Sequence, residues 1–95
     1  MTASEHVRHE FIFHGHVQGV GFRFTTEQVA SRHDITGWVQ NLPDRTVKCV
    51  VEGESSVINA FLVGIHEAMS GHIVDTQELQ APATGEFKGF KVRYD

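Results

Sequence analysis

The sequence predicts an α+β fold in which two helices pack on one face of a mostly antiparallel sheet. Segments with the two-residue period of strands alternate with segments of helical period, in an order that suits such a sandwich. The chain has 95 residues, of which 40% are hydrophobic. That length suits one modest core, because two separate cores would each be too small to be stable. We expect residues 1–95 to form a single domain, with residues 1–6 frayed at the N-terminus.

The N-terminal half predicts a strand, a helix and a second strand. Val7, Phe11 and Phe13 share one face of an extended segment, which predicts a strand over residues 7–14. Residues 15–21 form a glycine-rich loop, and residues 35–42 predict the next strand, followed by a turn at 41–45 that contains Pro-Asp. A helix is predicted from residue 22 to about residue 33, with one face made by Phe22, Thr26, Val29, Ala30 and His33.

The C-terminal half predicts a strand, a helix and two further strands. Alternating Val47, Cys49 and Val51 predict a third strand that ends near Gly53. Ser55 or Ser56 is expected to cap the second helix, whose apolar stripe consists of Val57 or Ile58, Phe61, Leu62, Ile65 and Met69. Residues 73–79 predict a polar edge strand, 81–85 a loop, and 90–94 a short last strand. The order βαββαβ, with an extra short C-terminal strand, is that of a ferredoxin-like sandwich.

Composition excludes several classes of protein. A formal net charge of −4 argues against nucleic acid or an anionic membrane as partner, since both need a positive field. No apolar run is long enough to span a bilayer, and the N-terminus lacks the apolar region of a signal peptide, so we expect a cytoplasmic protein. The single cysteine, Cys49, excludes an internal disulfide or a CxxC site and is expected to be a buried small hydrophobe.

The segment with the most chemical information is the loop with Gly15, Gly19 and Gly21, followed by Arg23. Glycines let successive peptide N–H groups converge on an anion where a helix begins, and a guanidinium can grip two phosphate oxygens. A tight turn whose glycines serve packing only, with Arg23 in solvent, is the alternative. No Gly-Lys-Ser/Thr follows the loop, so it is not a P-loop, and Phe24 stands where a dinucleotide fingerprint needs a small residue.

Two segments resemble signatures of the acylphosphatase family. Residues 15–23, Gly-His-Val-Gln-Gly-Val-Gly-Phe-Arg, match the first with only His16 at a variable position, and residues 37–41, Gly-Trp-Val-Gln-Asn, resemble the second. The length, the element order and a terminal Phe-x-Val-x-Tyr strand are similar too, so the resemblance covers almost the whole chain. The sequence departs from the family at Arg45, where glycine is usual. A positive φ there would strain the turn by about 1 kcal/mol.

The resemblance implies a hydrolase that cleaves the carboxyl-phosphate bond of small-molecule acyl phosphates, with no cofactor and no metal. It implies that the guanidinium of Arg23 binds the phosphoryl group and that Asn41 orients the attacking water. Inorganic phosphate or sulfate would compete for the same place, and we expect a monomer. The phosphoryl group would also bind the loop's peptide N–H groups, which belong to His16, Val17, Gln18, Gly19, Val20, Gly21 and Phe22.

Several other interpretations of the sequence remain open. His6, His9, His14 and His16 could hold a transition metal, although incidental surface histidines are expected. Phe11 and Phe13 could stack bases in an RNA-binding module, but the third strand lacks aromatic residues. Asp44, Glu52 and Glu54 are expected to be solvated charges. The nearest rival function is an anion- or carbamoyl-phosphate-binding acylphosphatase-like domain of a larger maturation enzyme, and a non-catalytic regulator is a further one.

Overall fold

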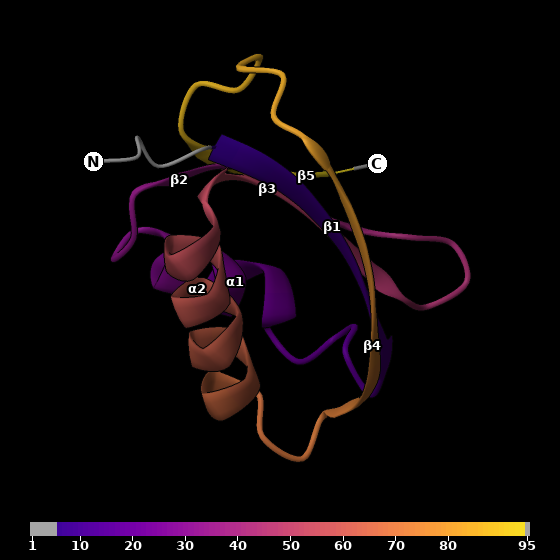
Figure 1. The fold of residues 1–95 in the computed structure, drawn as a ribbon. Helices are drawn as coiled ribbons and strands as arrows, with labels where there is room; N and C mark the ends of the chain where they lie inside the picture. The colour runs from indigo at the N-terminus through magenta and orange to yellow at the C-terminus, as the bar shows by residue number, and fades with distance from the viewer. Residues whose placement is uncertain (1–5, 95) are drawn as a thin grey trace.

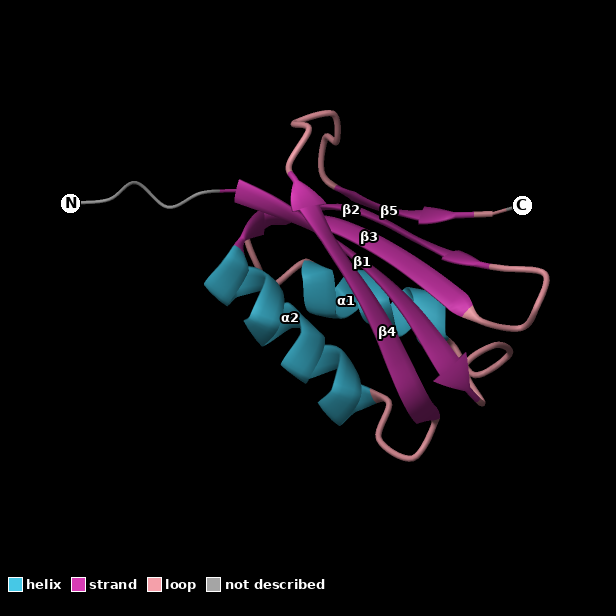
Figure 2. Cartoon of the chain, turned by 45° about the vertical axis from the view of Figure 1, so that its right-hand side comes forward, coloured by secondary structure: helices cyan, strands magenta, loops and turns pink. Residues whose placement is uncertain are grey.

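Two helices cover one face of a five-stranded sheet in the computed structural model, which describes residues 6–94 (Figure 1). The sheet order is β4-β1-β3-β2-β5, and Figure 2 shows both helices on the same side. All neighbouring strands are antiparallel except β2 and β5, which are parallel. The predicted ferredoxin-like fold is confirmed. Its elements are β1 (His6–Gly15), α1 (Phe22–Ala30), β2 (Ile35–Asn41), β3 (Val47–Glu54), α2 (Ser55–Ala68), β4 (Ile73–Pro82) and β5 (Phe90–Arg93).

The core lies between the helices and the sheet. Strand alternation points Phe11 and Phe13 of β1 and Cys49 of β3 towards the helices, and all three are fully buried. Burying one such phenylalanine side chain stabilises the fold by about 1.5–3 kcal/mol. From the helices, the buried side chains are Phe22, Thr26, Val29, Ala30, Ile58, Phe61 and Ile65. The predicted apolar faces of both helices are therefore the faces that pack on the sheet.

The first strand departs from the sequence expectations at its histidines. His6 is the first residue of β1, while residues 1–5, the rest of the stretch expected to fray, lie outside the described residues. His9 was expected at the surface but is only 2% exposed. It shares the helix-facing side of the strand with Phe11, and its Nδ1 lies 2.7 Å from the carboxylate of Glu78 on β4. The surface interpretation is wrong for His9 because the two-residue period of β1 includes it among the core residues.

Element ends differ from the expectations by a few residues. The helix α1 ends at Ala30, and the chain continues in tighter turns with N–H groups of Arg32 and His33 bonded three residues back. A serine cap on α2 is wrong, because the N-cap is Glu54, whose side chain makes no capping hydrogen bond. The edge position of β4 is confirmed, and this strand extends to Pro82.

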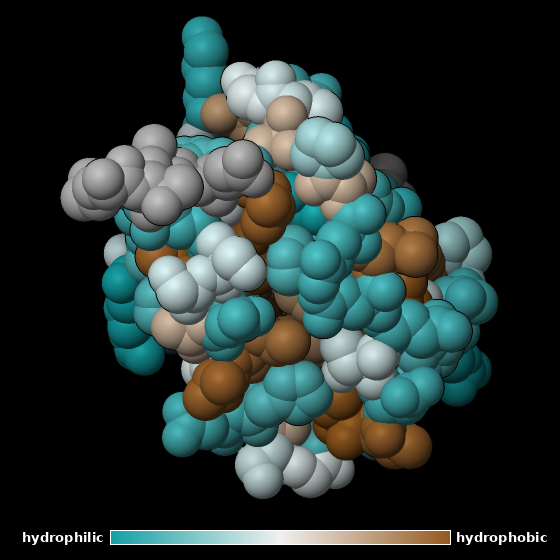
Figure 3. Space-filling view, in the orientation of Figure 1, coloured by the Kyte–Doolittle hydropathy of each residue, from teal (hydrophilic) through white to brown (hydrophobic). Residues whose placement is uncertain are grey.

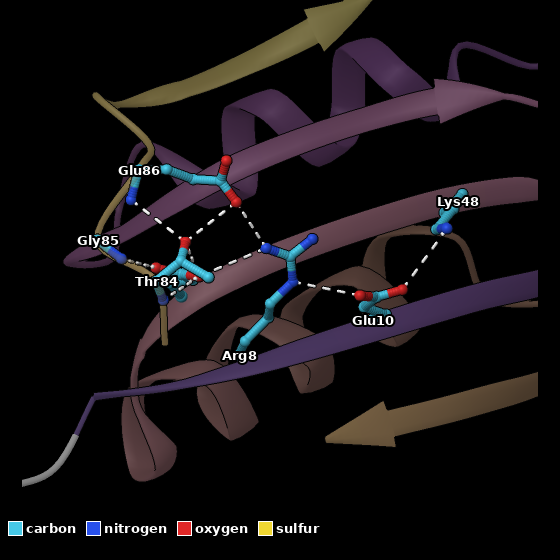
Figure 4. A network of polar contacts seen from close by, with 7 residues as sticks. Arg8, Glu10, Lys48, Thr84, Gly85 and Glu86 are labelled. Carbon is cyan, nitrogen blue, oxygen red and sulfur yellow. Dashed lines mark hydrogen bonds and ion pairs between the residues drawn. The ribbon is translucent and has the colours of Figure 1, made fainter. Parts of the chain in front are cut away.

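The outer face of the sheet, away from the helices, is partly covered by the segment between β4 and β5 (Figure 4). Glu52 of β3 is only 3% exposed and accepts hydrogen bonds from the Thr84 N–H (2.8 Å), the Thr84 hydroxyl (2.9 Å) and the Gly85 N–H (2.9 Å). Arg8 of β1 reaches the same segment by an ion pair of 2.8 Å with Glu86. The expectation of a solvated Glu52 is wrong, because a distant segment folds back over it.

The surface carries scattered apolar side chains. On the face seen in Figure 3, hydrophilic residues surround smaller hydrophobic patches. Large exposed hydrophobic side chains over the described chain are Phe24, Val63, Val74, Leu79 and Tyr94. Neither of the helices within residues 6–94 has the length and apolar content that crossing a bilayer requires.

Candidate active site

The loop between β1 and α1 has a backbone that requires glycine. Gly19 and Gly21 have φ of 78° and 76°, in the left-handed region that side chains disfavour, and Gly21 is the N-cap of α1. Gly15, with φ 128°, lies so close to the carbonyl of His72 that a Cβ would collide with it. These positions turn the chain sharply from the end of β1 into the first turn of the helix.

Side-chain contacts fix the loop to the rest of the fold. Val17 is fully buried in the core, and Nε2 of Gln18 donates to the carbonyls of Leu42 (2.8 Å) and Thr46 (2.9 Å) in the turn after β2. The peptide N–H of His16 donates to the His72 carbonyl at 2.9 Å. These contacts tie the loop to the turn after β2 and to the segment before β4, and the His16 N–H already has an acceptor.

The peptide N–H groups that follow take no part in the hydrogen bonds of the described chain. Within residues 6–94, nothing accepts a hydrogen bond from the N–H groups of residues 17–24; the first helical bond runs from Thr25 to the carbonyl of Gly21. Free N–H groups at a helix N-terminus carry partial positive charge and favour an anion. The loop and the first turn of α1 therefore form a surface that suits a phosphate-sized anion.

Arg23 lies in this first helical turn and is held by the C-terminal strand. Its Nη1 donates to the carbonyl of Arg93 at 3.2 Å, and its guanidinium carbon lies 4.7 Å from the ring centroid of Tyr94. A cation at a helix N-terminus opposes the helix dipole at a cost of about 0.3–1 kcal/mol, which an anion bound in the loop would offset. The two contacts tie the guanidinium to the C-terminal segment of the chain.

Asn41 approaches the same place from the end of β2. It shares the helix-facing side of the strand with Val39, and its Oδ1 is buried without a hydrogen-bond partner among the described residues. Buried acceptors are rarely left unpaired, so such an atom marks a place for a water or a ligand donor. The unpaired oxygen belongs to a side chain at the end of β2, close to the loop.

These residues share a pocket of about 200 Å³, here called the loop pocket. Of the residues predicted for the site, the structure brings Val17, Gly19, Gly21, Phe22, Arg23 and Asn41 together in its lining. His16 and Gln18 instead line a neighbouring hollow together with Arg45, and Val20 lines neither. Phe24 and Tyr94 complete the loop pocket and were missed by the sequence analysis. Both are exposed aromatics, but an isolated exposed aromatic carries no signal that separates a site from ordinary surface.

Comparison with known proteins decides the family. The family model described as acylphosphatase matches residues 9–92. The chain belongs to the acylphosphatase family. It is 42% identical over 90 residues to an acylphosphatase from Marinobacter nauticus, covering 92% of this chain and 96% of that one. It is accordingly a hydrolase of this family.

Solved structures agree with the family and its fold. An acylphosphatase from Bacillus subtilis matches with a TM-score of 0.85 and 25% identity, over 93% of this chain and 99% of that one. Full-length HypF, solved in a phosphate- and nucleotide-bound form, matches with a TM-score of 0.86 and 28% identity. That match covers 98% of this chain but only 12% of HypF, so the same fold also occurs as a small part of a much larger protein.

The residues that the sequence analysis considered for other roles lie outside the loop pocket. Cys49 is fully buried, as predicted, and burial raises the pKa of its thiol. Phe11 and Phe13 are also fully buried, so they offer no surface for stacking bases. His14 Nε2 lies 2.9 Å from Oε1 of Gln77. Over residues 6–94, histidine, cysteine and carboxylate side chains nowhere gather in threes with the geometry to hold a metal ion.

Proposed function

We propose that the loop pocket binds the phosphoryl group of an acyl phosphate and hydrolyses its carboxyl-phosphate bond. The observation that carries the proposal is that Arg23 and Asn41, from different elements, line one pocket with the glycine loop. The peptide N–H groups of residues 17–22 and the fork of Arg23 would hold the phosphoryl oxygens. His16 was expected to take part, but its N–H already donates to His72, so its role would be to fix the loop.

Asn41 would position the attacking water. Its unpaired Oδ1 can accept a hydrogen bond from a water O–H and aim the water oxygen at phosphorus. As the new P–O bond forms, the bond from phosphorus to the carboxyl oxygen breaks, and the electron pair leaves with the carboxylate. The proton from water passes to a phosphate oxygen. Positioning and charge stabilisation supply most of the rate in phosphoryl transfer, which suits a site with few titratable groups.

The carboxylate leaving group explains how a site without a general acid could hydrolyse an acyl phosphate. A carboxylate leaves readily without a proton, so the reaction needs no general acid, and the proposal requires no metal or cofactor. Inorganic phosphate and sulfate have the tetrahedral anionic shape of the bound group, so they would compete with the substrate.

Hydrolysis of benzoyl phosphate in the presence of a metal chelator tests the proposal, with Asn41→Ala as the diagnostic variant. We expect Asn41→Ala to lower kcat by about 10²–10³, the typical loss when one preorganised polar group is removed. Inhibition by inorganic phosphate should be preserved, because phosphate is held by the loop and Arg23. If phosphate affinity collapsed together with kcat, Asn41 would be a phosphate ligand and the assigned role would be wrong.

A second candidate function is supported by the match to HypF, in which this fold is a small part of a phosphate- and nucleotide-bound protein. In that case the loop pocket would bind phosphate or carbamoyl phosphate without free-standing hydrolysis. The same assay separates the two functions. Turnover of benzoyl phosphate by the wild-type chain that disappears in Arg23→Ala supports hydrolysis, whereas phosphate binding without turnover supports the second function.

A further inference from the structure

We propose that the outer face of the sheet carries a second binding site, for a small organic anion that contains an aromatic ring. The site is a pocket of about 330 Å³ between the sheet and the segment before β5, here called the outer pocket. It differs from the loop pocket in place and in chemistry, and it has no part in the proposed hydrolysis. Its lining is Gly37, Trp38, Glu86, Phe87, Lys88, Gly89, Lys91, Val92 and Arg93.

The outer pocket is lined by three positively charged side chains, which favour an anionic ligand. Lys88, Lys91 and Arg93 form no ion pair with any carboxylate of the described residues. The acidic residue of the lining, Glu86, is already paired with Arg8 at 2.8 Å. The positive charges of Lys88, Lys91 and Arg93 line one pocket with no carboxylate of residues 6–94 paired to them, so they repel one another, and an anion bound among them would relieve that repulsion.

Arg93 is oriented for such a ligand by Trp38. Its guanidinium carbon lies 4.3 Å from the ring centroid of Trp38, a stacked arrangement that fixes the side chain. No residue between 6 and 94 accepts a hydrogen bond from the Arg93 side chain, so none of these residues competes with a ligand for its N–H donors. A stacked arginine with a free fork binds carboxylate or phosphate in a bidentate manner with little loss of side-chain entropy.

The segment before β5, which contributes Glu86 and Phe87 to the outer pocket, is tied to the sheet by polar contacts, and Figure 4 shows those of Thr84, Gly85 and Glu86. Glu52 holds this segment through Thr84 and Gly85, and the guanidinium of Arg8 lies 5.4 Å from the Phe87 ring centroid. At the other end, the N–H of Gly37 donates to the Gly89 carbonyl at 3.0 Å. These contacts exist without a ligand, and Phe87 contributes an aromatic side chain to a lining that also holds the cations, which suits a ring attached to the anionic group.

The alternation of the strands separates the two pockets. On β2, Val39 and Asn41 face the helices while Trp38 faces outward, and on β5 Val92 packs against the core while Arg93 stacks on Trp38. The outer pocket therefore lies on the opposite face of the sheet from Arg23 and Asn41. A ligand in it would leave the loop pocket open to substrate.

Adenosine monophosphate is a suitable probe, because it joins an aromatic ring to a phosphate, and Trp38 is the single tryptophan of the sequence. We expect a saturable change in Trp38 fluorescence at millimolar or lower concentration of the probe. Adenosine, which lacks the anion, and ribose 5-phosphate, which lacks the ring, should each bind about tenfold more weakly. Equal affinity for the probe and ribose 5-phosphate, or no saturable change up to about 10 mM, would overturn the proposal.

Variants identify the pocket that the probe occupies. Lys91→Gln and Arg93→Gln should each weaken binding by about tenfold, while the matched control Arg32→Gln, which removes an exposed arginine elsewhere, should leave it unchanged. Binding should also persist in Arg23→Gln, which impairs the loop pocket. Loss of binding in Arg23→Gln with retention in Lys91→Gln and Arg93→Gln would place the probe in the loop pocket and refute the outer site.

Discussion

Arg23 differs from a generic positive charge because of the two contacts that hold it. Its hydrogen bond to the Arg93 carbonyl and its stack on Tyr94 both use the planar guanidinium. A lysine keeps the charge but loses the fork that grips two oxygens. We predict that Arg23→Lys lowers kcat/KM for benzoyl phosphate by about 10²–10³, nearly as much as Arg23→Ala. Steady-state kinetics of both variants measure this, and full activity in the lysine variant would contradict a bidentate role.

Arg45, the residue at which the sequence departs from the family, has a φ of 72°. The condition under which the turn would be strained is therefore met, and this conformation costs an L-residue about 1–2 kcal/mol. We predict that Arg45→Gly raises the free energy of unfolding by up to about 1 kcal/mol, since the greater freedom of glycine in the unfolded chain offsets part of the relief. Urea denaturation measures the change. Arg45→Ala is the control, because it removes the side chain and keeps the strain; an equal gain in both variants would mean that φ is not the cause.

At the residue scale, the sequence predicted the centre of the candidate site better than its surroundings. Arg23, Asn41 and the glycines stand in contiguous motifs, so their types and spacing carry the signal. The side-chain bonds of Gln18 to the turn after β2, and the contact of Tyr94 with Arg23, join segments distant in the chain. Such contacts follow from the folded arrangement, and no local pattern in a single sequence encodes them.

Among the elements, the short strand β5 contacts the candidate site from the far end of the chain, because the carbonyl of its last residue, Arg93, accepts a hydrogen bond from Arg23. Tyr94 directly follows this strand and is 75% exposed, so its removal should leave the core intact. We predict that Tyr94→Leu lowers kcat/KM for benzoyl phosphate by about 2–5-fold, the loss expected from an exposed cation–π contact. Tyr94→Phe keeps the ring and should retain activity. If the loss of kcat/KM in Tyr94→Leu were accounted for by a larger unfolded fraction of the variant, measured by urea denaturation, the role of Tyr94 would be purely structural.

The types of the elements were predictable from the sequence, whereas their end residues and the burial of His9 were not. The two-residue period of β1 predicted Phe11 and Phe13 as core residues. The same period includes His9, but the polar side chain of His9 led to the expectation of a surface position. A tertiary contact accompanies the burial of His9, since the carboxylate of Glu78 on the edge strand β4 lies beside its ring. Likewise β4 continues to Pro82 because β1 offers partners as far as Val7, although residues 80–82 have no strand-like pattern.

At the scale of the whole molecule, one acidic residue holds the segment that partly covers the outer face of the sheet. Glu52 of β3 joins the segment before β5 to the middle of the sheet, 32 residues away from Thr84 in the chain. Burial alone raises the pKa of this carboxyl, but the hydrogen bonds from Thr84 and Gly85 and the charge of Arg8 outweigh it, so the pKa lies below its ordinary value of 4.5. The ionised form is therefore the one that the fold stabilises.

This pKa shift predicts how stability depends on pH. A carboxyl whose pKa is lower in the folded than in the unfolded state stabilises the protein above its unfolded pKa, and the contribution is lost as the pH falls through the folded pKa. Glu52→Gln should therefore lower the free energy of unfolding by about 2 kcal/mol near pH 7 and by much less near pH 3. Urea denaturation of both proteins at the two pH values measures the difference. Glu67→Gln, which neutralises an exposed carboxylate on α2, is the matched control and should change stability little at either pH. A loss in Glu52→Gln that stays constant between the two pH values would mean that its cause is altered packing and that the ionised carboxylate contributes nothing.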